Sequence, residues 1–168
     1  ESRLILFGGW ANKWMDDVVL WAGPRNHLVH YKLRRGELFN IVAVFHSQKY
    51  VEGWDEYGDP AELYEQFKNT QPEVQALLKK IDVWKMWVLC DRVPVKEWTQ
   101  NRVTLIGDAA HPMLPFLGMG AAMALEDGVV LARCLEKYDM PAAAFAAYEE
   151  ARKERTKGVL LDSRKQGI

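Results

Sequence analysis

The sequence is poor in cysteine, has no long apolar run and carries almost no net charge. Cys90 and Cys134 are its only cysteines and lack metal-ligand spacing, which excludes a disulfide framework and a zinc site. No apolar run approaches the roughly 20 residues that span a bilayer. Lys and Arg number 22 against 23 Asp and Glu, so no positive field attracts nucleic acid. We therefore expect a cytoplasmic protein without metal, membrane or nucleic-acid partners, in which both cysteines are small core residues.

What the sequence does contain is typical of a globular domain, with 49% hydrophobic and 27% charged residues. Three runs that favour strands follow one another at 17–22, 27–33 and 38–45, separated by loops of about four residues. Connections this short favour antiparallel pairing over crossover connections.

Helical patterns come next along the chain. Asp59 and Pro60 are a candidate cap and first-turn proline for a helix over 61–69, and Pro72 begins a second helix. Residues 83–89 alternate with apolar side chains on both faces, which predicts a strand buried on both sides. The remaining elements are a short strand and two long helices, expected over 101–107, 121–138 and 142 to about 158.

The stretch 103–128 carries the chemical information. A strand delivers Gly107 and Asp108 at its carboxyl end, where ligands of α/β sheets usually bind. Gly118 and Gly120 then allow the backbone to approach a ligand closely where the next helix begins. The first amides of that helix have no internal partner and lie at the positive end of its dipole, so they form an anion site. The Asp108 carboxylate, an acceptor only, suits a hydroxyl donor such as a ribityl alcohol.

A Gly-x-Gly helix start is by itself more often a tight connection than a ligand site. The ordered set here is more specific: Gly107-Asp-Ala-Ala-His111, then Pro115, then Gly118 and Gly120, then Glu126-Asp127. This order resembles the second flavin-binding motif of the group A FAD-dependent aromatic hydroxylases, the family of the salicylate and hydroxybenzoate hydroxylases.

The resemblance implies FAD as cofactor, NADH or NADPH as co-substrate, and O2 and a small aromatic substrate as partners. It implies that Asp108 hydrogen-bonds a ribityl hydroxyl, that Pro115 lies beside the isoalloxazine ring, and that the amides of 118–122 face the flavin pyrimidine. The implied cofactor-binding residues are Gly107, Asp108, Pro115, Gly118, Met119, Gly120, Ala121 and Ala122. Leu117 and Met119 are apolar where many members carry polar residues. The resemblance therefore implies that these two positions contact the flavin through their backbone and not through polar side chains.

The resemblance extends over nearly the whole chain. Segments 21–24, 27–31 and 35–44 resemble the sheet that covers the aromatic substrate in this family. The implied fold is α/β: an antiparallel substrate-covering sheet with two helices over 1–98, and part of a Rossmann-like FAD/NAD(P)-binding domain over 99–168. The family's Gly-x-Gly-x-x-Gly fingerprint, which binds the ADP half of FAD, is absent. We therefore expect the chain to be the carboxyl-terminal portion of a longer enzyme.

Several other residues have both a functional and a structural interpretation. Tyr31 and His30 are candidate catalytic residues that accept or relay a phenolic proton, and only one can face the substrate, because strand neighbours point to opposite faces. The more common structural alternative is a cross-strand aromatic pair and a solvent-facing histidine. We expect His111 to lock its loop by a hydrogen bond, and 152–155 to form a solvated helix face.

Three functions stay open on the sequence alone. The first is an FAD-dependent monooxygenase that hydroxylates an aromatic acid with NAD(P)H and O2. The second is a flavin oxidoreductase of the same superfamily that acts on a bulkier polyketide or quinone precursor. The third, from another class, is an inert flavin-fold fragment that serves as a binding or assembly module. We expect the 168-residue chain by itself to bind FAD weakly or not at all, to lack hydroxylase activity, and to self-associate through an unpaired strand at 103–106.

Overall fold

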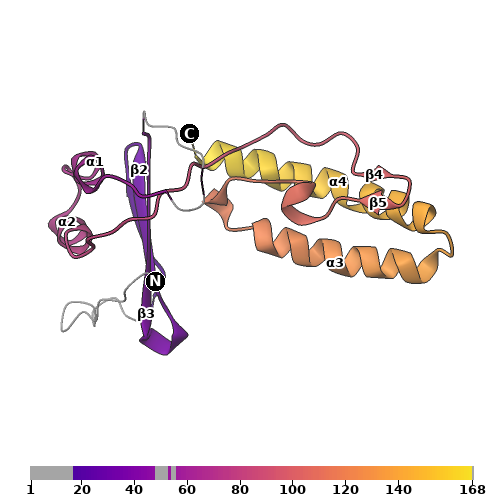
Figure 1. Cartoon of the computed structure of the whole chain (residues 1–168), viewed down its shortest axis with the longest axis horizontal. Coiled ribbons are helices and arrows are strands. Elements are labelled where there is room, and N and C mark those ends of the chain that lie inside the picture. Colours follow the sequence, from indigo (N-terminus) through magenta and orange to yellow (C-terminus); the bar gives the residue numbers. More distant parts are fainter. Residues whose placement is uncertain (1–16, 48–52, 54–55, 168) are drawn as a thin grey trace. The chain divides into compact units, whose positions relative to one another are not determined.

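The computed structural model describes residues 17–47, 53 and 56–167, which belong to two compact units. One unit comprises residues 1–88 and the other residues 89–168. Figure 1 shows helices and antiparallel strands in the chain, as the α/β class predicts. The predicted domain boundary between residues 98 and 99 stays a prediction.

A three-stranded antiparallel sheet lies at the centre of the first unit, as the short connections predict. Its strands pair in the order β1 (Val19–Gly23), β2 (Asn26–Leu33) and β3 (Leu38–Phe45). The register places His27 of β2 opposite Ala22 of β1 and Val44 of β3. In the turn that joins β2 to β3, Gly36 has a φ of 94°, a conformation that glycine adopts without strain.

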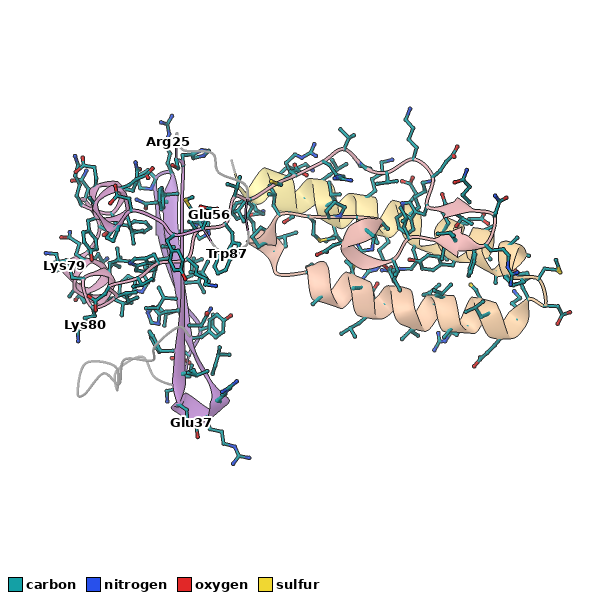
Figure 2. All side chains as sticks on the ribbon, in the orientation of Figure 1. Arg25, Glu37, Glu56, Lys79, Lys80 and Trp87 are labelled. Carbon is teal, nitrogen blue, oxygen red and sulfur yellow. The ribbon has the colours of Figure 1, made fainter. Side chains whose placement is uncertain are left out.

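Helices cover one face of this sheet. Figure 1 shows α1 (Pro60–Gln66) and α2 (Pro72–Leu78) on the same side of the strands. The core beneath them is made of Leu28 from β2 and of Leu63, Phe67, Val74, Leu77 and Leu78. In Figure 2, Lys79 and Lys80 at the end of α2 lie on the side away from the sheet. On the opposite, open face of the sheet Leu20 and Val42 are 60% and 45% exposed.

The helix signals in the sequence are confirmed with small changes. The Asp59 carboxylate accepts a hydrogen bond from the Ala61 amide at 2.9 Å, and such a cap stabilises a helix by about 1 kcal/mol. The first helix ends at Gln66 and not at 69, because Phe67 leaves the helical region with φ −107° and ψ 10°. Thr70 donates from its hydroxyl and its amide to the Phe67 carbonyl, which turns the chain toward α2.

Residues 83–89 do not form the doubly buried strand that their alternation predicts. A single bridge between Lys85 and Tyr57 is the pairing found in this segment among the described residues. Val83 and Trp87 remain 66% and 56% exposed, and Figure 2 labels Trp87. A strand buried on both sides needs neighbours along its whole length, and the described chain provides one at a single position.

The second unit begins with a short hairpin in place of the single strand expected over 101–107. Its strands are β4 (Thr99–Gln100) and β5 (Val103–Thr104). Asn101 lies in the turn with a φ of 54°, so the strand starts only at Val103. The Leu105 amide donates to the Trp98 carbonyl at 2.9 Å and extends the pairing. The expectation that residues 103–106 lack a strand neighbour is therefore wrong.

Two long helices, α3 (Gly120–Lys137) and α4 (Pro141–Gln166), lie side by side in the second unit (Figure 1). α4 continues past the predicted end at Gly158, because Leu160 and Ser163 in its last turns are buried. Cys134 on α3 is partly buried against this core, but Cys90 is exposed, so the prediction of a core residue is wrong for Cys90. Within the described ranges, every helix is too short or too polar to span a bilayer.

Candidate functional site

The connection between β5 and α3 begins with a sharp turn at Gly107. This residue has a φ of 59°, in the left-handed region that favours glycine. A Cβ added there would lie 3.3 Å from the Cβ of Ala124, so the loop passes close to α3. The Ala110 amide donates to the Gly107 carbonyl at 2.9 Å and closes the 3₁₀ turn η3 (Gly107–Ala109). The turn leaves the side chain of Asp108 exposed.

The same connection ends in a second turn that delivers the start of α3. The 3₁₀ turn η4 (Pro115–Leu117) is closed by the Gly118 amide, which donates to the Pro115 carbonyl at 2.9 Å. Gly118 has a φ of 62°, and no atom lies within 4 Å of a Cβ added there. The Met123 amide donates to the Met119 carbonyl at 2.9 Å. The amides of 120–122 precede this bond and have no acceptor in the helix.

Asp108 and the start of α3 lie beside each other. A Cβ added at Gly120 would come within 3.9 Å of the Asp108 Oδ1 atom. No acidic side chain occupies the first turn of α3, so the positive end of its dipole is not neutralised from within the helix. The pair offers a ligand one exposed carboxylate, which accepts from hydroxyl groups, and a set of backbone donors, which favour negative charge.

A buried carboxylate holds this connection in place. Asp127 on α3 is completely buried, and its Oδ2 atom accepts from the Gly107 amide at 3.0 Å and contacts the His111 Nε2 atom at 2.6 Å. Its Oδ1 atom accepts from the Arg152 Nε atom of α4 at 2.7 Å. The prediction that His111 locks the loop is therefore confirmed, and its partner is Asp127.

The prediction of a solvated helix face over 152–155 is confirmed for the exposed Glu154 and Arg155 but is wrong for Arg152. Arg152 is only 3% exposed, and its Nη1 atom donates to the Glu126 Oε2 atom at 2.6 Å. Arg155 also binds Glu126, through its Nε and Nη2 atoms at 2.7 and 2.6 Å, but its side chain is 54% exposed. The local pattern of charges hides these contacts because the acidic partners lie on the other helix. A signal was present nonetheless: Glu126-Asp127 belongs to the motif, and arginines three residues apart share a helix face.

Hydrogen bonds decide the charge of both acids in this cluster. Burial alone would raise the pKa of Asp127, but hydrogen bonds from Arg152, His111 and the Gly107 amide outweigh burial and lower the pKa below its ordinary value. The hydrogen bond from Arg155, opposed by desolvation and assisted by Arg152, lowers the pKa of Glu126 to about 2. Both carboxylates are therefore ionised at neutral pH.

Tyr148 on α4 anchors the strand that leads into the connection. Its hydroxyl donates to the Leu105 carbonyl at 3.2 Å, and its ring centroid lies 5.9 Å from that of Trp98. Burial, followed by the charge of Asp127, raises the pKa of Tyr148, so the hydroxyl remains a donor. β5 and the loop after it are thus held to the helices from both ends.

In the first unit, His30 and Tyr31 lie on opposite faces of the sheet, as neighbours on a strand must. The His30 ring is completely buried on the face that the helices cover, with the Phe39 ring centroid at 5.1 Å, so the solvent-facing alternative is wrong. Tyr31 lies opposite Asn40 on the open face and has no aromatic partner there on β3. His27, four residues before Tyr31 on β2, shares the open face. Burial lowers the pKa of His27, so its imidazole is neutral at neutral pH.

Comparison with known proteins defines the class to which this fold and connection belong. Residues 16–163 match the family described as the FAD binding domain, and the chain belongs to that family. A 3-hydroxybenzoate 6-hydroxylase of Klebsiella oxytoca is 44% identical over 150 residues, which are 89% of this chain and 38% of that protein. The chain therefore spans about two fifths of the length of the relatives it matches.

Solved structures confirm the fold. A salicylate hydroxylase substrate complex matches with a TM-score of 0.76 and 31% identity over 88% of this chain and 39% of that one. HpxO of Klebsiella pneumoniae, solved with FAD and uric acid, matches with a TM-score of 0.78 and 26% identity over 90% of this chain and 39% of that one. The predicted resemblance to flavoprotein aromatic hydroxylases is thus confirmed.

The residues of the connection fit part of an FAD molecule. The exposed Asp108 carboxylate suits the ribityl hydroxyls, and the unpaired amides with open space at Gly118 suit a planar acceptor group. All eight predicted cofactor-binding residues lie in this connection and the first turn of α3, but their contact with FAD stays a prediction. The sequence reasoning missed Arg152 as the support of the loop. It also missed His27 as a second polar side chain on the same sheet face as Tyr31, which the period-two alternation of β2 indicates.

We expect Asp127→Asn to destabilise the protein by about 3 kcal/mol at neutral pH, because it removes one partner of a buried ion pair. The folded pKa of Asp127 lies below its ordinary value of 3.8, so its contribution is complete above that value and is lost as the pH falls through the folded pKa. Urea unfolding from about pH 7 to about pH 3 should therefore show a shallower acid loss of stability in Asp127→Asn than in the wild type. Asp162→Asn, at an exposed site on α4, is the matched control. Equal acid slopes for Asp127→Asn and the wild type would contradict this assignment.

Proposed function

We propose that the protein containing this chain is an FAD-dependent monooxygenase that hydroxylates a small aromatic acid with NADH or NADPH and O2. The observation that carries this proposal is the 44% identity to a 3-hydroxybenzoate 6-hydroxylase over a stretch that includes the whole β5–α3 connection. The fold similarity to a salicylate hydroxylase at 31% identity supports the same substrate class.

Asp108 and the start of α3 would hold the flavin half of FAD. Asp108 would accept a hydrogen bond from a ribityl hydroxyl, and the amides of 119–122 would face the pyrimidine, since the Gly118 amide of the predicted range 118–122 is already bonded to the Pro115 carbonyl. Pro115, exposed in η4, lies beside the ring, and its fixed φ keeps the turn rigid. FAD supplies the redox and oxygen chemistry when it is bound. The chain contributes orientation and the partial positive charge of the helix start, which favours negative charge on the pyrimidine.

The open face of the β1–β3 sheet would cover the aromatic substrate. Tyr31 and His27 are polar side chains on this face, among apolar neighbours such as Val29 and Val42. The neutral His27 imidazole would accept the phenolic proton, or Tyr31 would relay it by passing its own hydroxyl proton on to solvent, and either transfer leaves a more electron-rich ring for oxygen attack. Since the His30 ring is buried on the covered face, we assign it a packing role.

The contact of Asp108 with FAD is the first part of the proposal that can be tested. Asp108→Ala in the full-length protein should weaken FAD binding by about 1.5–3 kcal/mol, the range for a hydrogen bond to a charged group. Titration of the apo-protein with FAD measures this loss. Asp162→Ala, which removes an exposed carboxylate elsewhere, should leave the Kd unchanged. An unchanged Kd in Asp108→Ala would remove Asp108 from the site.

The substrate class can be tested by a screen of acids. Salicylate-like or hydroxybenzoate-like acids should stimulate NAD(P)H oxidation by the full-length protein. The reason is that the chain is similar in sequence to a 3-hydroxybenzoate 6-hydroxylase and in fold to a salicylate hydroxylase. Stimulation by polycyclic phenols in their place would favour a flavin oxidoreductase of the same superfamily with a bulkier substrate. No stimulation and no bound flavin would favour an inert flavin-fold module.

Tyr31 can be separated from a structural role by a matched pair of tyrosines. Tyr31→Phe should lower the turnover of a phenolic acid by about 10²-fold or more, the scale of general acid–base catalysis, with little change in the unfolding midpoint. Tyr64→Phe removes the hydroxyl of a tyrosine that packs against the core on the covered side and should leave turnover unchanged. Equal turnover in Tyr31→Phe and the wild type would exclude Tyr31 as a relay of the phenolic proton.

A further inference from the structure

Arg152 on α4 forms hydrogen bonds with residues of α3 that support the candidate flavin site. It contacts none of the residues proposed to bind FAD. Its Nε atom donates to Asp127 at 2.7 Å, its Nη1 atom to Glu126 at 2.6 Å, and its Nη2 atom to the Met123 carbonyl at 3.3 Å. All three partners lie in the first half of α3. The side chain is almost completely buried, so these bonds are not weakened by water.

Asp127 transmits this restraint to the turn that carries Asp108. The Oδ2 atom of Asp127 accepts from the Gly107 amide and contacts the His111 ring. These two residues stand on either side of Asp108 in the sequence. Since both bind one oxygen atom, a movement of the Asp127 carboxylate moves both ends of the turn together.

The same guanidinium restrains the first turn of α3. Its Nη2 atom binds the carbonyl of Met123, and the amide of Met123 donates to the Met119 carbonyl in that turn. The amides of 120–122 lie within this turn. Arg152 therefore connects to the Asp108 turn through Asp127 and to the helix start through the Met123 carbonyl.

We propose that Arg152 is a positioning residue that sets the spacing between the Asp108 carboxylate and the free amides of α3, and through it the affinity and reduction potential of FAD. This inference rests on the proposed function. The planar fork of arginine is required because three donors point to three fixed acceptors, and a lysine ammonium in the same place cannot meet all three.

The test compares Arg152→Lys with the wild type in the full-length protein. We expect the Kd of FAD for the apo-protein to rise about tenfold, a coupling typical of residues in one hydrogen-bond network. The reduction potential of bound FAD should become more negative, because misplaced amides stabilise the reduced, more negative flavin less well. A role in stability alone would lower the unfolding midpoint and leave both quantities unchanged.

Two comparisons make the result specific. Arg155→Lys alters the other arginine that binds Glu126 but does not contact Asp127, so its Kd should stay within about twofold of the wild type. In an Asp108→Ala background, Arg152→Lys should raise the Kd by much less than tenfold, because the contact that it positions has been removed. If Arg152→Lys does not fold, His111→Gln weakens the same link and should show the same coupling with Asp108→Ala.

The outcomes separate this inference from the proposed function. A wild-type protein that binds FAD and loses affinity in Asp108→Ala, but not in Arg152→Lys, would overturn the positioning role and leave the proposed function intact. Equal effects of Arg152→Lys and Arg155→Lys, or full additivity with Asp108→Ala, would also overturn it. A wild-type protein that holds no FAD would overturn both.

Discussion

The carboxylate of Asp127 on α3 joins two segments that are distant in the sequence: the turn from Gly107 to His111 and helix α4. Burial of a charge of this kind costs several kcal/mol unless partners satisfy it, and here both oxygen atoms are satisfied by an amide, an imidazole and a guanidinium. Because the partners come from the Gly107–His111 turn and from α4, the charge can be buried only when both segments are packed against α3. The geometry of the β5–α3 connection is a consequence of that requirement.

The motif contains two aspartates whose environments are opposite, and the difference separates support from ligand contact. Asp127 lies in the interior with both oxygen atoms hydrogen-bonded, whereas Asp108 is exposed. Gly107 makes this division possible, since its left-handed φ turns the chain outward directly after the amide that Asp127 binds. Sequence alone ranks the two residues equally as acids, and only their burial shows which one is available to a ligand.

Local patterns predicted the elements whose contacts are close in sequence. The strands of the β1–β3 sheet are joined by short turns, and α1 carries its cap and proline next to one another, so neighbouring residues decide both. The predicted strand over 83–89 was wrong because alternating apolar residues favour an extended segment but do not provide a neighbouring strand for it. The predicted exposure of Arg152 was wrong for a related reason. A charged run is normally solvent-exposed, but the acidic partners of Arg152 lie about 25 residues earlier, on the facing helix. The prediction of a flavin site rested on the order of the motif residues, which hydrophobic periodicity alone does not reveal.

The short connection between α3 and α4 bears on the order in which the second unit assembles. Glu126, Asp127 and Arg152 all lie on these two helices, which are separated by residues 138–140 alone. Contacts across such a helical hairpin have low sequence separation and form quickly in folding chains. We therefore expect the paired helices to form first and to present the Asp127 carboxylate to the Gly107 amide and the His111 ring, so that the turn carrying Asp108 packs onto helices already in place. Substitutions at turn residues that do not touch Asp127 should therefore change the exposed surface of the turn without changing the step that builds the unit.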